Sequence, residues 1–186
     1  METTDLKISI IGAGNMGGAI ARGLSKGTTV QASNIRVSDI SADHLQALQT
    51  FAPEISISRT NVEIIKDADI IILAVKPWLV EPVEKEIEHK IDYKKQIIVS
   101  IAAGVDFEKL SELFDTEASI FRVIPNTAID ILESVTTIAA QKATKEQQDL
   151  VLTLFAEMGK AFLVPESQLN AFMSLSSCGI AYAFRY

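Results

Sequence analysis

The sequence predicts an α/β fold with a doubly wound, mainly parallel sheet and a C-terminal helix. Two observations support this prediction. Short apolar runs alternate with stretches of helical periodicity along most of the chain, which is typical of parallel strands joined by crossover helices. Residues 70–75 are apolar without a polar face, which indicates a strand covered by helices on both sides. Together they favour a sheet of the Rossmann type.

Each strand and helix is expected from its local pattern. The expected strands are 6–11, 34–38, 55–57, 70–75, 96–101, 119–124, 134–140 and 161–164, with the β-branched run 134–140 at an edge of the sheet. The expected helices are 15–25, one carrying Leu45 and Leu48 and capped by Ser41 or Asp43, 61–68, one capped by Asp106, 144–158 with Thr144 and Gln147 as a capping box, and the chain from 166 onward. The only candidate domain boundary lies near Pro165.

A glycine-rich turn lies between the first strand and the first helix. Gly12 permits a sharp turn, Gly14 lets a pyrophosphate approach the backbone, and Gly17 lets the helix pack close to the strand. The N–H groups of the helix N-terminus are available to bind phosphates. An ordinary structural glycine turn is the alternative. The expected nucleotide-binding residues here are Gly12, Ala13, Gly14, Asn15, Met16 and Gly17.

The carboxyl ends of five strands carry unusual residues, and ligands of parallel sheets bind at these ends. Asp39 suits the hydroxyls of an adenosine ribose or, alternatively, a helix cap. Lys76 is either a solvated lysine or a residue of the crevice, and Pro77 keeps the backbone beside it rigid. The small residues after residue 101 allow a flat ring of the dinucleotide to lie against the backbone, or form a plain tight turn. The expected cofactor-binding residues at these ends are Ser38, Asp39, Ala74, Val75, Lys76, Pro77, Ala102, Ala103 and Gly104, and Asn126 is expected near the substrate.

The composition excludes several classes of protein. The chain has 186 residues, of which 48% are hydrophobic, and no apolar run reaches the roughly 18 residues that a membrane helix needs. Its formal net charge of −7 argues against a nucleic-acid partner. Its single cysteine and acidic N-terminus favour a cytoplasmic location. No spacing of histidine or cysteine predicts a metal site, and both His44 and His89 are expected at the surface.

Five stretches resemble the pyrroline-5-carboxylate reductase family over essentially the whole chain. They are Gly12-Ala13-Gly14-Asn15-Met16-Gly17, Ala74-Val75-Lys76-Pro77, Ser100-Ile101-Ala102-Ala103-Gly104, Arg122-Val123-Ile124-Pro125-Asn126-Thr127 and Leu175-Ser176-Ser177-Cys178-Gly179-Ile180-Ala181-Tyr182. There are departures from the family pattern: Ser177, Cys178 and Ile180 replace a glycine, a serine and a proline, and Leu132 and Ser134 stand where the family often has G-x-G.

The resemblance implies an NAD(P)H-dependent oxidoreductase that transfers hydride to the C=N carbon of a cyclic imine and forms proline. It implies that residues 1–164 form the dinucleotide-binding domain, and that residues 165–186 are the first helix of a truncated dimerisation domain. The full-length protein would then be a homo-oligomer, and this chain is expected to bind the nucleotide but to be incomplete for catalysis. No catalytic residue is assigned, because an imine can already be protonated near neutral pH and a strong protein acid is therefore not required.

Further site residues remain open between two interpretations. The resemblance places Asn61 near the adenosine, whereas its position equally suits a helix cap. Ser176, Ser177, Cys178 and Gly179 either face the nicotinamide and substrate or form a closely packed helix, in which Cys178 is a buried, unreactive thiol. Asp39 and the absence of Arg or Lys at 40–42 favour NADH, although Ser38 and Ser41 could donate to the 2′-phosphate of NADPH. The alternatives are a nucleotide-binding module without catalysis and a related hydroxyacid dehydrogenase, for which Asn170 alone supplies only part of the expected lysine–asparagine pair.

Overall fold

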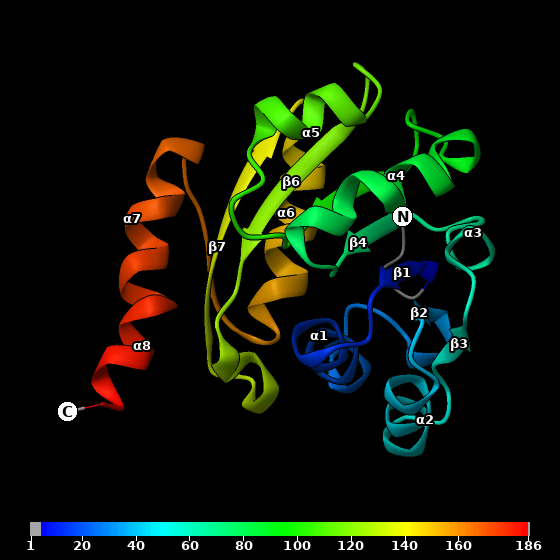
Figure 1. Cartoon of the computed structure of the whole chain (residues 1–186), viewed down its shortest axis with the longest axis horizontal. Helices are drawn as coiled ribbons and strands as arrows, with labels where there is room; N and C mark the ends of the chain where they lie inside the picture. Colours follow the sequence, from blue (N-terminus) through cyan, green and yellow to red (C-terminus); the bar gives the residue numbers. More distant parts are fainter. Residues whose placement is uncertain (1–4, 186) are drawn as a thin grey trace.

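The computed structural model describes residues 5–185 and contains a single eight-stranded sheet with the strand order β3-β2-β1-β4-β5-β6-β7-β8. The strands are β1 (Ile8–Ile11), β2 (Ile35–Ser38), β3 (Ser56–Ser58), β4 (Ile70–Leu73), β5 (Ile97–Ser100), β6 (Ser119–Ile124), β7 (Ser134–Gln141) and β8 (Gly159–Leu163). Every neighbouring pair is parallel except β6 and β7. The predicted fold class, a doubly wound and mainly parallel sheet, is therefore confirmed (Figure 1).

Helices cover both faces of the sheet. The α-helices are α1 (Asn15–Lys26), α2 (Ala42–Phe51), α3 (Asn61–Ile64), α4 (Val80–Ile87), α5 (Phe107–Leu113), α6 (Lys145–Ala156), α7 (Glu166–Ser176) and α8 (Cys178–Ala183). Short 3₁₀ turns lie at η2 (Ala32–Asn34), η3 (Pro77–Leu79), η4 (Glu88–Lys90) and η5 (Thr127–Ile131).

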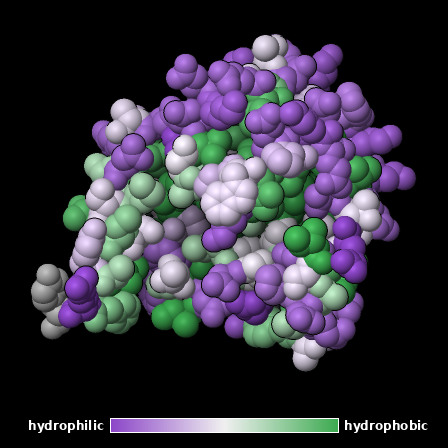
Figure 2. Space-filling model, viewed as in Figure 1, coloured by the Kyte–Doolittle hydropathy of each residue, from purple (hydrophilic) through white to green (hydrophobic). Residues whose placement is uncertain are grey.

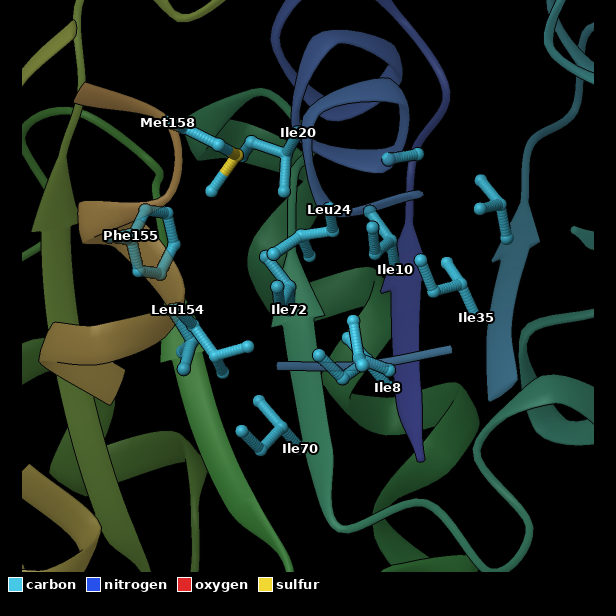
Figure 3. Close-up of a cluster of buried hydrophobic side chains, with 14 of the residues drawn as sticks. Ile8, Ile10, Ile20, Leu24, Ile35, Ile70, Ile72, Leu154, Phe155 and Met158 are labelled. Carbon is cyan, nitrogen blue, oxygen red and sulfur yellow. The ribbon is translucent and has the colours of Figure 1, made fainter. Parts of the chain in front are cut away.

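Two hydrophobic cores result from the alternation of side chains along the buried strands. Ile70 and Ile72 point into the core shared with α1, α2 and α6, where Leu24 and Phe155 also lie (Figure 3). Ile71 and Leu73 point into the opposite core, which is shared with α3, α4, α5 and α7. The central strands are therefore apolar on both faces, as their sequences predict.

The expected helix starts are observed. Ser41, rather than Asp43, caps α2 by accepting the N–H of His44, and Asp106 caps α5 by accepting the N–H of Lys109. Thr144 and Gln147 form the predicted capping box at the start of α6.

The expectation that residues 134–140 form an edge strand is wrong. Strand β7 pairs with β6 on one side and with β8 on the other, so β8 is the edge. Thr136 and Thr137 are fully buried, because β7 is covered on both faces. The β-branched composition of this run therefore reflects burial inside the sheet rather than exposure at its edge.

Helix α4 is absent from the elements expected from the sequence. Its sequence is rich in charged residues, so its helical pattern is weak. The apolar residues Val80, Val83 and Ile87 nevertheless recur at helical spacing and pack on the sheet. Pro82 lies in the first turn of this helix, where a missing N–H breaks no intrahelical bond.

Glu84 of α4 is buried among these apolar residues. It is 3% exposed, and its Oε1 atom has no hydrogen-bond partner among the described residues. Burial, together with the nearby Glu88, raises the pKa of Glu84 above its ordinary value of 4.5. The charged form of this side chain therefore destabilises the fold.

We expect Glu84→Gln to stabilise the protein by about 1 kcal/mol at neutral pH, because a neutral amide costs less to bury than a carboxylate. A carboxyl with a raised pKa lowers stability as the pH rises from about 4.5 through that pKa. The gain should therefore grow over this range, and urea unfolding of both proteins at several pH values measures it. An equal difference in stability at every pH would contradict the argument.

The C-terminal segment contains two helices instead of the single expected helix. Helix α7 ends at Ser176, and α8 begins at Cys178 after a break at Ser177. Helix α7 contacts β7, and both helices lie at one end of the molecule, drawn in orange and red in Figure 1. Leu175, Tyr182 and Phe184 are exposed, and the surface of these helices is of mixed hydropathy (Figure 2). No helix within residues 5–185 is long and apolar enough to span a membrane.

Candidate functional site

A cleft of about 1120 Å³ lies at the carboxyl ends of the parallel strands. Five strand ends contribute to its lining, since the strands run in the same direction and end at the same edge of the sheet. The contributing residues are Gly12 after β1, Asp39 after β2, Val75 after β4, Ala102 after β5 and Pro125 after β6. The topology thus brings together the strand ends that the sequence singled out.

The three glycines of the first turn have different structural roles. Gly12 has a φ of +103°, and a Cβ there would lie 2.5 Å from the carbonyl oxygen of Ala74. A Cβ on Gly17 would lie 2.0 Å from the carbonyl oxygen of Gly12. A Cβ on Gly14 would meet nothing within 4 Å, and its φ of −63° is available to any residue. The protein itself therefore requires glycine at positions 12 and 17, whereas position 14 borders open space in the cleft.

The N-terminus of α1 is open to a ligand. Gly14 is its N-cap and supplies no side chain, and no acidic residue lies in the first turn. Asn15 and Met16, the first residues of the helix, both line the cleft. The N–H groups of this turn are thus available for an anion, which the helix dipole also favours.

Asp39 has a role that the sequence did not indicate. Its Oδ2 accepts the N–H of Ala13 at 2.6 Å, and its Oδ1 accepts the N–H of Ser41 at 2.7 Å. The alternative of Asp39 as a helix cap is wrong, because Ser41 caps α2. Asp39 therefore fixes the glycine turn to the end of β2, and it also lines the cleft.

Asn61 links three elements at the same end of the cleft. Its Oδ1 accepts the hydroxyl of Ser38 at 2.6 Å, and its Nδ2 donates to Oε2 of Glu86 at 2.7 Å. The alternative of Asn61 as a helix cap is wrong, since Thr60 occupies the N-cap position of α3. Ser38 itself is fully buried and does not line the cleft, so it acts on the cleft through Asn61.

Other predicted residues form the walls of the cleft. The residues after β4 that line it are Ala74, Val75, Lys76 and Pro77, and those after β5 are Ala102 and Ala103. Lys76 is exposed there, and no described acidic side chain lies within ion-pair distance of it. Gly104 is not part of the lining and has a φ of +81°, so its glycine serves the turn itself.

The predicted substrate-side residues are only partly brought together. Ser177 lines the cleft, whereas Asn126, Ser176, Cys178 and Gly179 do not. Asn126 is buried; its Oδ1 accepts the N–H of Ala128 and its Nδ2 donates to the carbonyl of Ser176, at the break between α7 and α8. Asn126 therefore holds the C-terminal helices against the strand end. The expectation of a buried thiol is wrong, because Cys178 is exposed at the surface beyond this break.

Several residues of the cleft were not anticipated from the sequence. Arg22 and Asp130 line it and form an ion pair at 2.5 Å. His44 was expected only at the surface; its side chain is half exposed, but it also lines the cleft, with Nδ1 3.5 Å from Asp39. Further unanticipated residues come from elements that pack over the strand ends: Ile40, Leu79, Pro82, Val83, Glu86, Ile129 and Met173. Among these residues, only Leu79, Pro82, Val83 and Glu86 could have been predicted from the sequence, because they follow the helical periodicity of α4.

Asn170, the residue that the hydroxyacid dehydrogenase alternative would need at the site, lies outside the cleft. Asn170 is exposed on α7, and it does not line the cleft. Within the described part of the chain, no group of three or more His, Cys, Asp or Glu side chains could hold a metal ion.

The fold and the cleft define a Rossmann-type α/β protein, and comparisons with known proteins identify its family. Residues 7–104 match the family model described as NADP oxidoreductase, coenzyme F420-dependent, and the chain belongs to this family. The predicted resemblance to pyrroline-5-carboxylate reductases is also confirmed. The chain is 37% identical to the pyrroline-5-carboxylate reductase of Methanosarcina acetivorans over 96% of its own length and 66% of that protein.

Solved structures agree with this assignment. A pyrroline-5-carboxylate reductase from Coxiella burnetii matches with a TM-score of 0.91 at 27% identity, covering 97% of this chain and 67% of the other. The Plasmodium falciparum pyrroline carboxylate reductase with NADP bound matches with a TM-score of 0.86 at 25% identity, covering 99% of this chain and 66% of the other. The chain thus spans about two thirds of the length of these relatives.

Proposed function

We propose that this chain is the nucleotide-binding part of a pyrroline-5-carboxylate reductase, an oxidoreductase that reduces 1-pyrroline-5-carboxylate to L-proline with NAD(P)H. The observation that carries the proposal is the convergence of the five family stretches: residues from each of them line a single cleft. The names of the relatives support the substrate, and the NADP in the Plasmodium structure supports the class of cofactor. Proline biosynthesis is the corresponding pathway.

The residues of the cleft fit a dinucleotide. The pyrophosphate would lie over Gly14, where a Cβ has no neighbour, against the free N–H groups of Asn15 and Met16. The adenosine ribose would lie at Asp39, whose two oxygens each keep a lone pair after accepting one N–H. The nicotinamide would lie against Ala102 and Ala103, towards the strand end that carries Pro125.

The cofactor would supply the hydride, and the residues of the cleft would orient it and exclude water. Ile101, Ile124 and Met173 give the nicotinamide side of the cleft an apolar wall. The helical break at Ser177, held by Asn126, closes the same side. We assign no proton donor, because a cyclic imine can already be protonated near neutral pH, so a strong acid from the protein is not required.

Titration calorimetry with NADH and NADPH, combined with the loss of absorbance of reduced cofactor on adding 1-pyrroline-5-carboxylate, tests the proposal. We expect this chain to bind at least one cofactor but to oxidise it slowly or not at all, and the full-length protein to oxidise it at a clear substrate-dependent rate. If neither NADH nor NADPH binds, the proposal is overturned. Binding without turnover by the full-length protein would favour the second candidate, a dinucleotide-binding module. The cleft also supports that candidate, since the residues proposed to contact the pyrophosphate, the ribose and the face of the nicotinamide lie within 12–103, and only part of the apolar wall lies beyond them.

We propose further that the protein prefers NADH to NADPH. Asp39 and Glu86 would both repel a 2′-phosphate at the adenosine end, and residues 40–42 offer no Arg or Lys. Arg22, His44 and Lys76 are the basic residues of the lining that could offset this repulsion, and Arg22 is already paired with Asp130. We expect the dissociation constant for NADH to be about tenfold lower. Calorimetry with the two cofactors measures the ratio, and a clear preference for NADPH would refute this argument.

We also propose that residues 1–164 form the dinucleotide-binding domain, and that residues 165–186 belong to a helical dimerisation domain of a homo-oligomer. The exposure of Leu175, Tyr182 and Phe184 supports this division, because an apolar face of this kind is typical of an interface. Sedimentation analysis would test it: a monomer at all concentrations would contradict an interface formed by α7 and α8.

A further inference from the structure

We propose that Glu86 recognises the adenine base of the dinucleotide by accepting a hydrogen bond from its 6-amino group. The proposal rests on the proposed dinucleotide function and adds a specificity-determining residue to it. No motif of the sequence pointed to Glu86, which lies on the unanticipated helix α4.

The position of the adenosine follows from the glycine turn and Asp39. With the pyrophosphate at the N-terminus of α1 and the ribose at Asp39, the base continues past the end of β2 towards α3 and α4. Here the cleft is lined by apolar side chains: Ile40, Val75, Leu79, Pro82 and Val83. A flat aromatic base suits these walls.

Glu86 lies at the far edge of this apolar region. It follows Pro82 and Val83 by one turn of α4, so the three residues lie on one side of the helix and all line the cleft. Its carboxylate therefore faces the polar edge of a base whose ring packs on Pro82 and Val83. In adenine this edge carries the 6-amino group, a hydrogen-bond donor, whereas a carboxylate only accepts.

The carboxylate of Glu86 is oriented but not saturated. Asn61 donates to its Oε2 at 2.7 Å, and Asn61 is in turn fixed by the buried hydroxyl of Ser38 at 2.6 Å. Among residues 5–185, no Lys, Arg or His forms an ion pair with Glu86. The other two carboxylates of the cleft have other roles: Asp39 accepts two N–H groups and is proposed to bind the ribose, and Asp130 pairs with Arg22. Glu86 is thus the carboxylate on the α4 side of the cleft, and its Oε1 is available to a base.

The test compares reduced NADH with reduced nicotinamide hypoxanthine dinucleotide, which differs by a carbonyl in place of the 6-amino group. We expect the wild-type protein to bind NADH about tenfold more tightly, the range expected for a hydrogen bond to a charged group that also repels the carbonyl. The N1–H of hypoxanthine lies one ring position away, so the base would have to leave its apolar wall to reach Glu86.

Glu86→Gln should bring the two dissociation constants within about twofold of each other, because an amide can both accept and donate. The matched control is Glu81→Gln on the same helix. Glu81 is exposed, as Glu86 is, but it pairs with Lys85 and does not line the cleft, so the tenfold ratio should remain. Melting temperatures of both variants show whether the fold is retained.

The outcomes separate the two proposals. If the wild type binds neither dinucleotide, the proposed function itself fails. If it binds both equally, or if Glu86→Gln keeps the wild-type ratio, the recognition of adenine by Glu86 is overturned while dinucleotide binding stands.

Discussion

Replacement of Gly14 by valine is expected to abolish dinucleotide binding and to leave the fold intact. A Cβ at this position meets no atom of the protein within 4 Å, so the added side chain extends into the space proposed for the pyrophosphate. We expect the dissociation constants for NADH and NADPH to rise at least about 100-fold, which corresponds to about 2.7 kcal/mol. Valine is a poor N-cap, so a loss of about 1 kcal/mol in stability is expected as well, which lowers the melting temperature by only a few degrees.

Gly17→Ala is the matched control, since it adds a smaller side chain in the same turn. Its Cβ would lie 2.0 Å from the carbonyl oxygen of Gly12 and 2.8 Å from the Cβ of Ala74. We expect a destabilisation of about 3 kcal/mol, because neither the backbone nor the buried strand end can move away. Calorimetry and urea unfolding of both variants distinguish the two roles. Wild-type affinity in Gly14→Val would show that the glycine turn is purely structural.

The fold was predictable from the sequence wherever the pattern is local. The fully apolar run of β4 is enough to predict a strand between two helical layers, and the side chains of Ser41 and Asp106 mark the starts of α2 and α5. The position of β7 was not predictable in this way. Its neighbours in the sheet are fixed by the pairing with β8, which begins 18 residues after β7 ends, and a β-branched run has the same composition at an edge as in the interior.

The candidate site was predictable where a residue directly follows a strand, because the topology of a parallel sheet brings all such residues to one edge. Residues that enter the cleft from the helices packed over that edge were missed. Glu86 and Met173 depend on how α4 and α7 pack against the sheet, and His44 depends on the orientation of α2. The two hydrogen bonds that Asp39 accepts were missed for a similar reason: one of the donors, Ala13, lies 26 residues away in the sequence.

A partly buried ion pair joins helix α7 to the sheet. Arg122 of β6 is 8% exposed at its side chain and donates to Oε1 of Glu166 at 2.6 Å. The same oxygen accepts the N–H of Phe107 at 2.7 Å, at the start of α5. Glu166 is the first residue of α7, so one carboxylate joins the sheet, α5 and the C-terminal helices.

Glu166→Ala is expected to destabilise the protein by about 2 kcal/mol. Removal of the carboxylate leaves the guanidinium of Arg122 buried without a counter-ion, and its Nε already lacks a hydrogen-bond partner among the described residues. Loss of one partner of a fully buried pair costs about 3–5 kcal/mol, and we expect the smaller value of about 2 kcal/mol because the side chain of Glu166 is 35% exposed to solvent. The measurement is urea unfolding, combined with hydrogen exchange over α7.

The double variant Arg122→Met/Glu166→Ala tests whether the buried charge is the cause. Because it removes the charge that is costly to bury, the double variant should be more stable than Glu166→Ala alone. Exchange over α7 should be faster in both proteins, since neither retains the bond that anchors its first turn. Met173 and Ser177, near the end of α7, line the side of the cleft proposed for the nicotinamide, whereas Asp39 and Glu86 line the end proposed for the adenosine. ADP-ribose, which lacks the nicotinamide, should therefore bind these variants as it binds the wild type, while NADH should bind them more weakly. An equal loss of affinity for both ligands would show that the ion pair supports the whole sheet rather than the position of α7.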